Sequence, residues 1–155
     1  MPQHPVQPTN SILVAGEPII EEYEVETETN MYPGKFVIKG TGAHQVLVAT
    51  AASVAVIGIL DVMPSYNCAK MYTDLTPYAA GTQVRVLRGD CVVRARVDHS
   101  AVITVGLKVE VLGEGNVGQY TTANADVGIS EEAFTGTGSP GAAADNWINI
   151  HLSNV

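Results

Sequence analysis

Two parts of this 155-residue chain follow the same order of glycines, apolar residues and strands. Each part has a Gly-x-x-Val segment, then an apolar-Gly-Ile-x-acid element, then an alternating strand: 33–38, 55–61 and 81–86 in the first half, and 105–111, 126–131 and 146–150 in the second. Gly34 and Gly58 are 24 residues apart, and Gly106 and Gly128 are 22 residues apart. A matched period is typical of a duplicated supersecondary unit, although chance similarity between β segments is the alternative explanation. Two such units predict one closed barrel or sandwich.

Short runs of β-branched and apolar residues, separated by glycine and other turn residues, continue through the rest of the chain. This pattern is typical of strands, and no segment has the 3.6-residue period of a three-turn amphipathic helix. We therefore predict an all-β fold, a small β-barrel or sandwich, with at most two helical turns around 66–72 and 130–134. Residues 17–28, in which glutamates alternate with apolar residues, are predicted to form a half-exposed strand. Residues 88–90, with Gly89 at their centre, are predicted to form a tight turn between two strands. Strands are expected at 17–28, 35–39, 46–49, 54–60, 82–87, 91–97, 101–105, 107–112 and 146–152.

The amino-terminal residues have a different composition from the rest of the chain. Pro2, Pro5 and Pro8 are spaced by three among polar residues, which favours an extended, polyproline-like conformation. We predict an extended arm over residues 1–16, followed by a single β domain over residues 17–155. The arm is either a frayed terminus or a segment that becomes ordered against a neighbouring subunit or a shell. In the second case, Pro5, Val6, Pro8 and Ile12 are its expected contact residues.

The composition excludes several classes of protein. Hydrophobic residues make up 46% of the chain and charged residues 15%, which argues against intrinsic disorder. A net charge of −8 leaves no surplus of Lys and Arg to neutralise phosphates, so no nucleic-acid partner is expected. The longest apolar stretch, 54–62, is too short to span a membrane, and the amino terminus lacks the pattern of a signal peptide. The cysteines, Cys68 and Cys91, match no zinc spacing and are predicted to be reduced.

Charge is distributed unevenly along the chain. Residues 17–28 hold six of the sixteen acidic residues and no basic residue, whereas four of the eight basic residues follow one another closely: Arg85, Arg88, Arg94 and Arg96. Arg94 and Arg96 share one face of the predicted strand. Because arginine binds carboxylates with two parallel hydrogen bonds, the acidic segment of a neighbouring copy is a candidate partner for this cluster. The alternative is that both segments are solvated faces.

No motif in the chain predicts catalysis. The four histidines are isolated, and Asp98 and His99 are adjacent on a strand, so their side chains point to opposite faces. Residues 113–118 match G-x-G-x-x-G without the strand-to-helix context of a nucleotide site, so we predict a turn there. Residues 58–61 superficially resemble the dUTPase motif that holds a general base, but the downstream elements are absent. We predict no catalytic residue, cofactor or metal.

Several segments together resemble the phage capsid cement, or head decoration, proteins: 33–38, 56–59, 80–86, 89–95, 127–133 and the strand 147–152 that follows a glycine-rich loop. This resemblance implies a virion protein made in the host cytoplasm, commonly a homotrimer, on the outer surface of an assembled head. Its implied partner is the major capsid protein, and its implied role is to stabilise the capsid by bridging capsomers. The alternatives are another β structural or glycan-binding module of a virion, such as a fibre base, or a small trimeric β enzyme.

Overall fold

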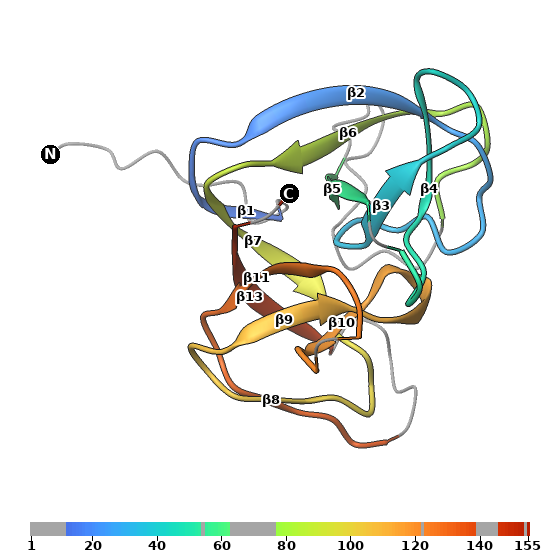
Figure 1. Ribbon diagram of the computed structural model, residues 1–155. Coiled ribbons are helices and arrows are strands. Elements are labelled where there is room, and N and C mark those ends of the chain that lie inside the picture. The colour runs from blue at the N-terminus through green and yellow to red at the C-terminus, as the bar shows by residue number, and fades with distance from the viewer. Residues whose placement is uncertain (1–11, 54, 63–76, 122, 139–145, 154) are drawn as a thin grey trace, which may run out of the picture.

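The computed structural model describes residues 12–53, 55–62, 77–121, 123–138, 146–153 and 155. All regular elements among them are strands, apart from one 3-10 turn at Gly113–Gly115. The all-β prediction is therefore confirmed. Figure 1 shows two groups of strands, β2–β6 in one and most of the later strands in the other.

The first unit, residues 19–88, is a closed five-stranded barrel in the order β2-β4-β3-β5-β6. All neighbouring strands are antiparallel except β2 and β4, which pair in parallel and close the barrel. Valine, leucine and aromatic side chains alternate inward and fill its interior. Its strands are β2 (Ile19–Val25), β3 (Phe36–Lys39), β4 (Gln45–Val48), β5 (Val56–Leu60) and β6 (Gln83–Arg88).

The second unit, residues 91–152, forms a six-stranded sheet together with β1 from the start of the chain, in the order β1-β7-β13-β11-β9-β10. Its strands β7, β10, β9, β11 and β13 correspond to β2, β4, β3, β5 and β6 of the first unit. A parallel bridge between Val97 and Val117 brings the end of β7 to β10, as the parallel pairing of β2 and β4 does in the first unit. A short two-stranded sheet of β8 and β12 lies beside it (Figure 1). The strands are β1 (Leu13–Gly16), β7 (Cys91–Arg96), β8 (Val102–Ile103), β9 (Lys108–Val111), β10 (Val117–Gln119), β11 (Asp126–Ser130), β12 (Phe134–Thr135) and β13 (Trp147–Leu152).

Backbone hydrogen bonds place corresponding residues of the two units in equivalent positions at one turn. The same pair of bonds closes the corresponding turn in each unit: Gly34 N–H to Leu60 O and Leu60 N–H to Lys35 O, and Gly106 N–H to Ser130 O and Ser130 N–H to Leu107 O. The repeat predicted from the glycine pattern is therefore confirmed as two pseudo-equivalent β units.

Each unit has a glycine at the same position of its central strand, and the reason is steric. Gly58 and Gly128 both lie where the register of a central strand shifts against its neighbour. A Cβ atom at Gly58 would lie 2.5 Å from the carbonyl oxygen of Leu87, and one at Gly128 would lie 2.2 Å from that of His151. Only glycine allows this close approach of two backbones.

Of the two hydrophobic core clusters, one fills the first barrel and the other contains residues of both units. Phe36, Ile59 and Leu87 are neighbours by register on the outer side of the first barrel, and each is at most 1% exposed. They belong to the same buried cluster as the inward side chains of β7, β9 and β13. The outer face of the first unit is therefore covered by the second unit and the segments around it.

Each of the nine expected strands overlaps an observed strand, whereas β1, β10, β11 and β12 were not among the expected strands. The helical turn expected at 130–134 is wrong, because Ser130 ends β11 with a bond to Leu107 and Phe134 already pairs with Ile103 in β12. The turn expected at 66–72 and most of the arm lie outside the described residues. The last residues assigned to the arm form β1, which pairs with β7.

Candidate functional site

The two units meet around a buried arginine. The guanidinium of Arg96, a residue only 4% exposed, lies 5.2 Å from the centre of the Tyr32 ring and 4.6 Å from that of Trp147. Its Nε donates a 2.8 Å hydrogen bond to the carbonyl of Pro33. Gly34 lies against Trp147 so closely that a Cβ there would be 2.3 Å from the ring. Arginine suits this position because its planar group stacks on aromatic rings while donating along its edge.

A second buried cation lies beside this arginine. Lys35 is 5% exposed, and its ammonium group lies 5.9 Å from the centre of the Tyr32 ring. Burial, together with repulsion from Arg96, lowers the pKa of Lys35 to about 8, against weaker attraction from Glu114 and Asp98. The junction therefore holds two positive groups in a region with little water, which costs folding free energy.

We expect this cost to be visible as a pH dependence. Lys35 keeps its proton in the unfolded chain up to about pH 10.5 but loses it in the folded protein near pH 8. Between these values the unfolded state binds more protons, so stability rises with pH. Relative to Lys35→Met, the natural protein should gain about 1–3 kcal/mol between pH 7 and 10, measured by urea unfolding. A difference that stays constant with pH would contradict this assignment.

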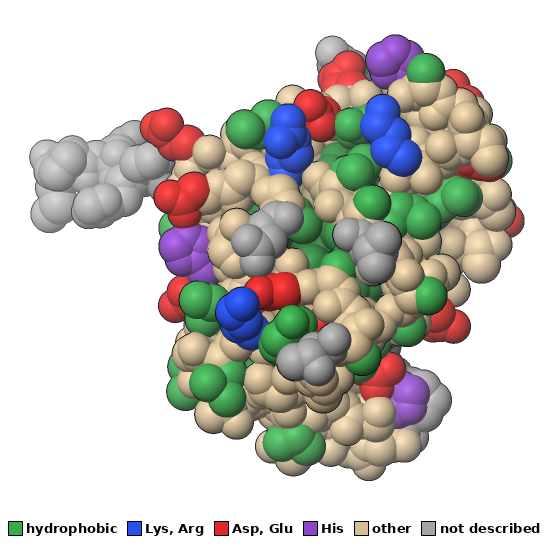
Figure 2. Space-filling view, in the orientation of Figure 1, with side chains coloured by type: hydrophobic (Ala, Val, Ile, Leu, Met, Phe, Trp, Pro, Cys, Tyr) green, Lys and Arg blue, Asp and Glu red, His purple; other side chains and the backbone are tan. Residues whose placement is uncertain are grey.

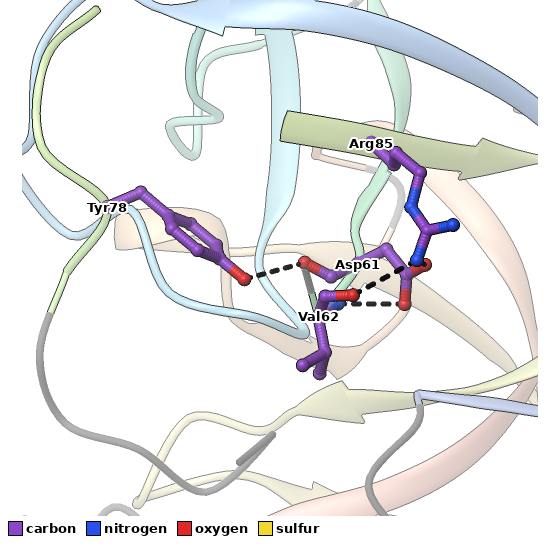
Figure 3. Close-up of polar contacts among 4 residues, drawn as sticks. All are labelled: Asp61, Val62, Tyr78 and Arg85. Atoms are coloured by element: carbon purple, nitrogen blue, oxygen red, sulfur yellow. Dashed lines mark hydrogen bonds and ion pairs between the residues drawn. The ribbon is translucent and has the colours of Figure 1, made fainter. Parts of the chain in front are cut away.

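A second polar cluster, shown in Figure 3, joins β5, β6 and Tyr78. Arg85 Nη2 lies 3.2 Å from a carboxylate oxygen of Asp61 and 3.3 Å from the carbonyl of Val62. The other Asp61 oxygen accepts from the Val62 N–H at 2.8 Å, and the Tyr78 hydroxyl donates to the Asp61 carbonyl at 3.1 Å. Burial raises the pKa of Asp61, while the Val62 N–H and Arg85 favour its charged form. The cluster ties Asp61 and Val62, which follow β5, to Arg85 of β6, and Asp61 also to Tyr78.

Glu110 performs a similar bracing role in the second unit. It is 2% exposed, and its carboxylate accepts from the backbone N–H and the side chain of both Thr121 and Asn124. Burial raises the pKa of Glu110, but these hydrogen bonds outweigh it and the net shift is downward. A carboxylate with four donors is a structural brace for the connection between β10 and β11.

The acidic segment and the arginine cluster meet within one chain. β2 pairs with β6, and Arg88 binds Glu21 through two nitrogen atoms at 3.0 and 3.2 Å. The bond to Arg88 is the main reason that the pKa of Glu21 is lowered. On the face of the molecule that Figure 2 shows, the Lys and Arg side chains lie apart from one another and form no basic patch.

The structure separates the predicted contact residues. Ile12 is fully buried in the shared core. Arg94 and Arg96 share one face of β7, as expected, but Arg96 is buried between aromatic rings, whereas Arg94 is partly exposed. Pro5, Val6 and Pro8 lie outside the described residues. Contact of these residues with another molecule stays a prediction.

The described residues contain no group of three or more His, Cys, Asp or Glu that could hold a metal ion. Within the same residues, no helix is long and apolar enough to cross a membrane. Among the buried polar side chains, Asp61, Arg96 and Glu110 form hydrogen bonds or ion pairs that brace the fold, whereas the buried charge of Lys35 costs folding free energy. The sequence did not single out Lys35 or Glu110, because an isolated Lys or Glu in a strand is usually on the surface.

Solved structures with low sequence identity share this fold. "The crystal structure of head fiber gp8.5 N base in bacteriophage phi29" matches with a TM-score of 0.54 and 9% identity, over 87% of this chain and 95% of that chain. "The capsid of Myoviridae Phage XM1" matches with a TM-score of 0.56 and 14% identity, over 96% of this chain and 91% of that chain. No curated protein sequence matches the chain.

The family comparison covers both units. Residues 13–153, from the start of β1 to the residue after β13, match the family described as "Structural cement protein (E217 gp24/Pam3 gp6)". The chain belongs to the phage structural cement protein family and is a structural virion protein that stabilises the capsid.

Proposed function

We propose that this protein binds the outer surface of an assembled head and stabilises it by bridging neighbouring subunits of the major capsid protein. The observation that carries the proposal is the family match over residues 13–153. Two braced units in one chain suit this role, because a rigid body can contact two capsid subunits at once. The protein has no enzymatic activity in this proposal, needs no cofactor, and binds neither nucleic acid nor membrane.

We further propose that the protein acts as a homotrimer, made in the host cytoplasm, with residues 17–155 as one domain. The shared core supports a single domain, because Phe36, Ile59 and Leu87 pack in the same cluster as side chains of the second unit. A trimer multiplies weak contacts through effective concentration. Sedimentation equilibrium of the purified protein tests the trimer, and a single unfolding transition tests the domain.

Co-sedimentation with expanded, undecorated heads tests the capsid role. The purified protein should pellet with heads in a saturable manner and raise the temperature at which the heads rupture. Binding with no gain in head stability would contradict the cement role. The fold shared with a head fibre base makes such a base the second candidate, and attachment that leaves head stability unchanged would favour it.

Deleting residues 2–11 tests the predicted arm. Ordering about ten residues costs roughly 10 kcal/mol of backbone entropy, lowered by the prolines, and each buried apolar side chain returns about 1.5–3 kcal/mol. Docking is then marginal for one arm and depends on several arms acting together. We expect the deletion to leave the Tm nearly unchanged while it weakens head binding or trimer formation. Undiminished binding would show that the arm is a frayed terminus.

A further inference from the structure

The equivalence of the two units identifies one face that is covered in the first unit and exposed in the second. Phe36, Ile59 and Leu87 correspond by register to Lys108, Ile129 and His151, which we name the outer face of the second unit. The first three side chains are at most 1% exposed, whereas Ile129 is 40% exposed. The side chains of Lys108 and His151 are 59% and 45% exposed.

A pocket opens at the edge of this face. It has a volume of about 360 Å³ and is lined by Gly89, Asp90, Ile129, His151, Leu152 and Ser153. Its apolar lining residues are Ile129, which is 40% exposed, and Leu152, which is buried. The nearby Ile19, 50% exposed, lies beside Gly89 and extends the apolar surface. An exposed apolar area with a pocket is typical of a binding surface.

The charge around the pocket is negative. His151 binds Asp90 through Nε2, and its Nδ1 lies 3.9 Å from Glu131. The Asp90 side chain is 91% exposed and that of Glu131 is 47% exposed. Lys108 does not offset them, because it forms a 2.7 Å ion pair with Asp126. Two carboxylates therefore face solvent around one imidazole.

We propose that the outer face of the second unit, with its pocket, binds a segment of the capsid protein that carries Lys or Arg next to apolar residues. The aliphatic stem of such a side chain would lie on Ile129, and its charged end would meet Asp90 and Glu131. The inference rests on the proposed function, because it names the surface by which this protein contacts the capsid.

Charge decides between the capsid and a second copy of this chain as the occupant. Each copy carries a net charge of −8, so the acidic pocket of one copy meets little positive charge on another copy. In the described part of the chain, three basic side chains form ion pairs with acids of the same chain, and Lys35 and Arg96 are buried. A chain with so few available cations is a poor counterpart for an acidic pocket.

The test compares head binding of matched variants. Asp90→Asn combined with Glu131→Gln, and separately Ile129→Ser, should weaken co-sedimentation with undecorated heads about tenfold or more. The charge variant should also lose much of the salt dependence of binding that the natural protein shows. The controls are Glu22→Gln with Glu28→Gln, and Val102→Ser, at exposed positions elsewhere. These controls should bind like the natural protein.

Each outcome has a defined meaning. If the pocket variants bind heads as well as the natural protein, the proposal is overturned while the cement function stands. If the natural protein itself does not bind heads, the proposed function fails first. If Ile129→Ser changes the sedimentation coefficient of the free protein without changing head binding, the face is an interface between copies and the proposal is wrong. Should Ile129→Ser fail to fold, the charge variants carry the test alone, because they change only exposed carboxylates.

Discussion

Replacing Gly128 by alanine is expected to lower the free energy of unfolding by about 3 kcal/mol. The added Cβ would lie 2.2 Å from the His151 carbonyl oxygen, and a backbone atom of a paired strand cannot move without breaking the pairing of β11 and β13. Gly58→Ala should behave similarly, because its Cβ would lie 2.5 Å from the Leu87 carbonyl oxygen. Urea unfolding followed by fluorescence measures both.

Gly113→Ala is the matched control for these two variants. No atom lies within 4 Å of a Cβ placed at Gly113, so we expect its stability to stay close to that of the natural protein. If Gly128→Ala were as stable as Gly113→Ala, the close pairing at the register shift would not be the reason for glycine in the repeat.

Truncating Arg96 to alanine is expected to cost about 3–5 kcal/mol. The change removes a planar group held between Tyr32 and Trp147 and leaves the Pro33 carbonyl without its 2.8 Å donor. Arg96→Lys should recover part of the loss, because it keeps the charge but not the fork. Thermal unfolding monitored by circular dichroism gives the comparison.

Two further observations separate this effect from a general loss of charge. Arg88→Ala removes an exposed ion pair with Glu21, in which the two side chains are 38% and 37% exposed, and should leave the stability close to that of the natural protein because solvent screens this pair. Arg96→Ala should also raise the pKa of Lys35, because Arg96 repels its charged form. A stability loss equal to that of Arg88→Ala would mean that Arg96 does not hold the two units together.

The alternation of side chains made the strands predictable. Inward positions of β6 and β13 are apolar in a period of two, and the same period is visible in the sequence. Strand 101–105 was predicted too long, because only Val102 and Ile103 pair with a neighbouring strand. Local propensity favours an extended conformation there, but a strand also needs a partner, which depends on the tertiary structure.

The functional surface was less predictable than the strands. The arginines were grouped in sequence, yet Arg88 binds Glu21 of the same chain, while Arg96 is buried between two aromatic rings. The two-residue period of a strand places Arg94 and Arg96 on one face of β7. It does not determine which other segment of the chain covers that face. The pocket beside Ile129 joins residues from β11, β13 and the turn after β6, so no local pattern marks it.

The sequence by itself determined the all-β class, the two repeated units and the glycines at their centres, because these depend on local periodicity and on where a side chain is absent. Only the tertiary structure decided which of two equivalent faces is buried. Ile59 and Ile129 occupy the same place in the repeat, yet the first is 0% exposed and the second 40%. Packing of one unit on the other covers a single copy of the face, because the units meet through non-equivalent surfaces: the outer side of the first barrel packs in one cluster with the inward side chains of the second unit.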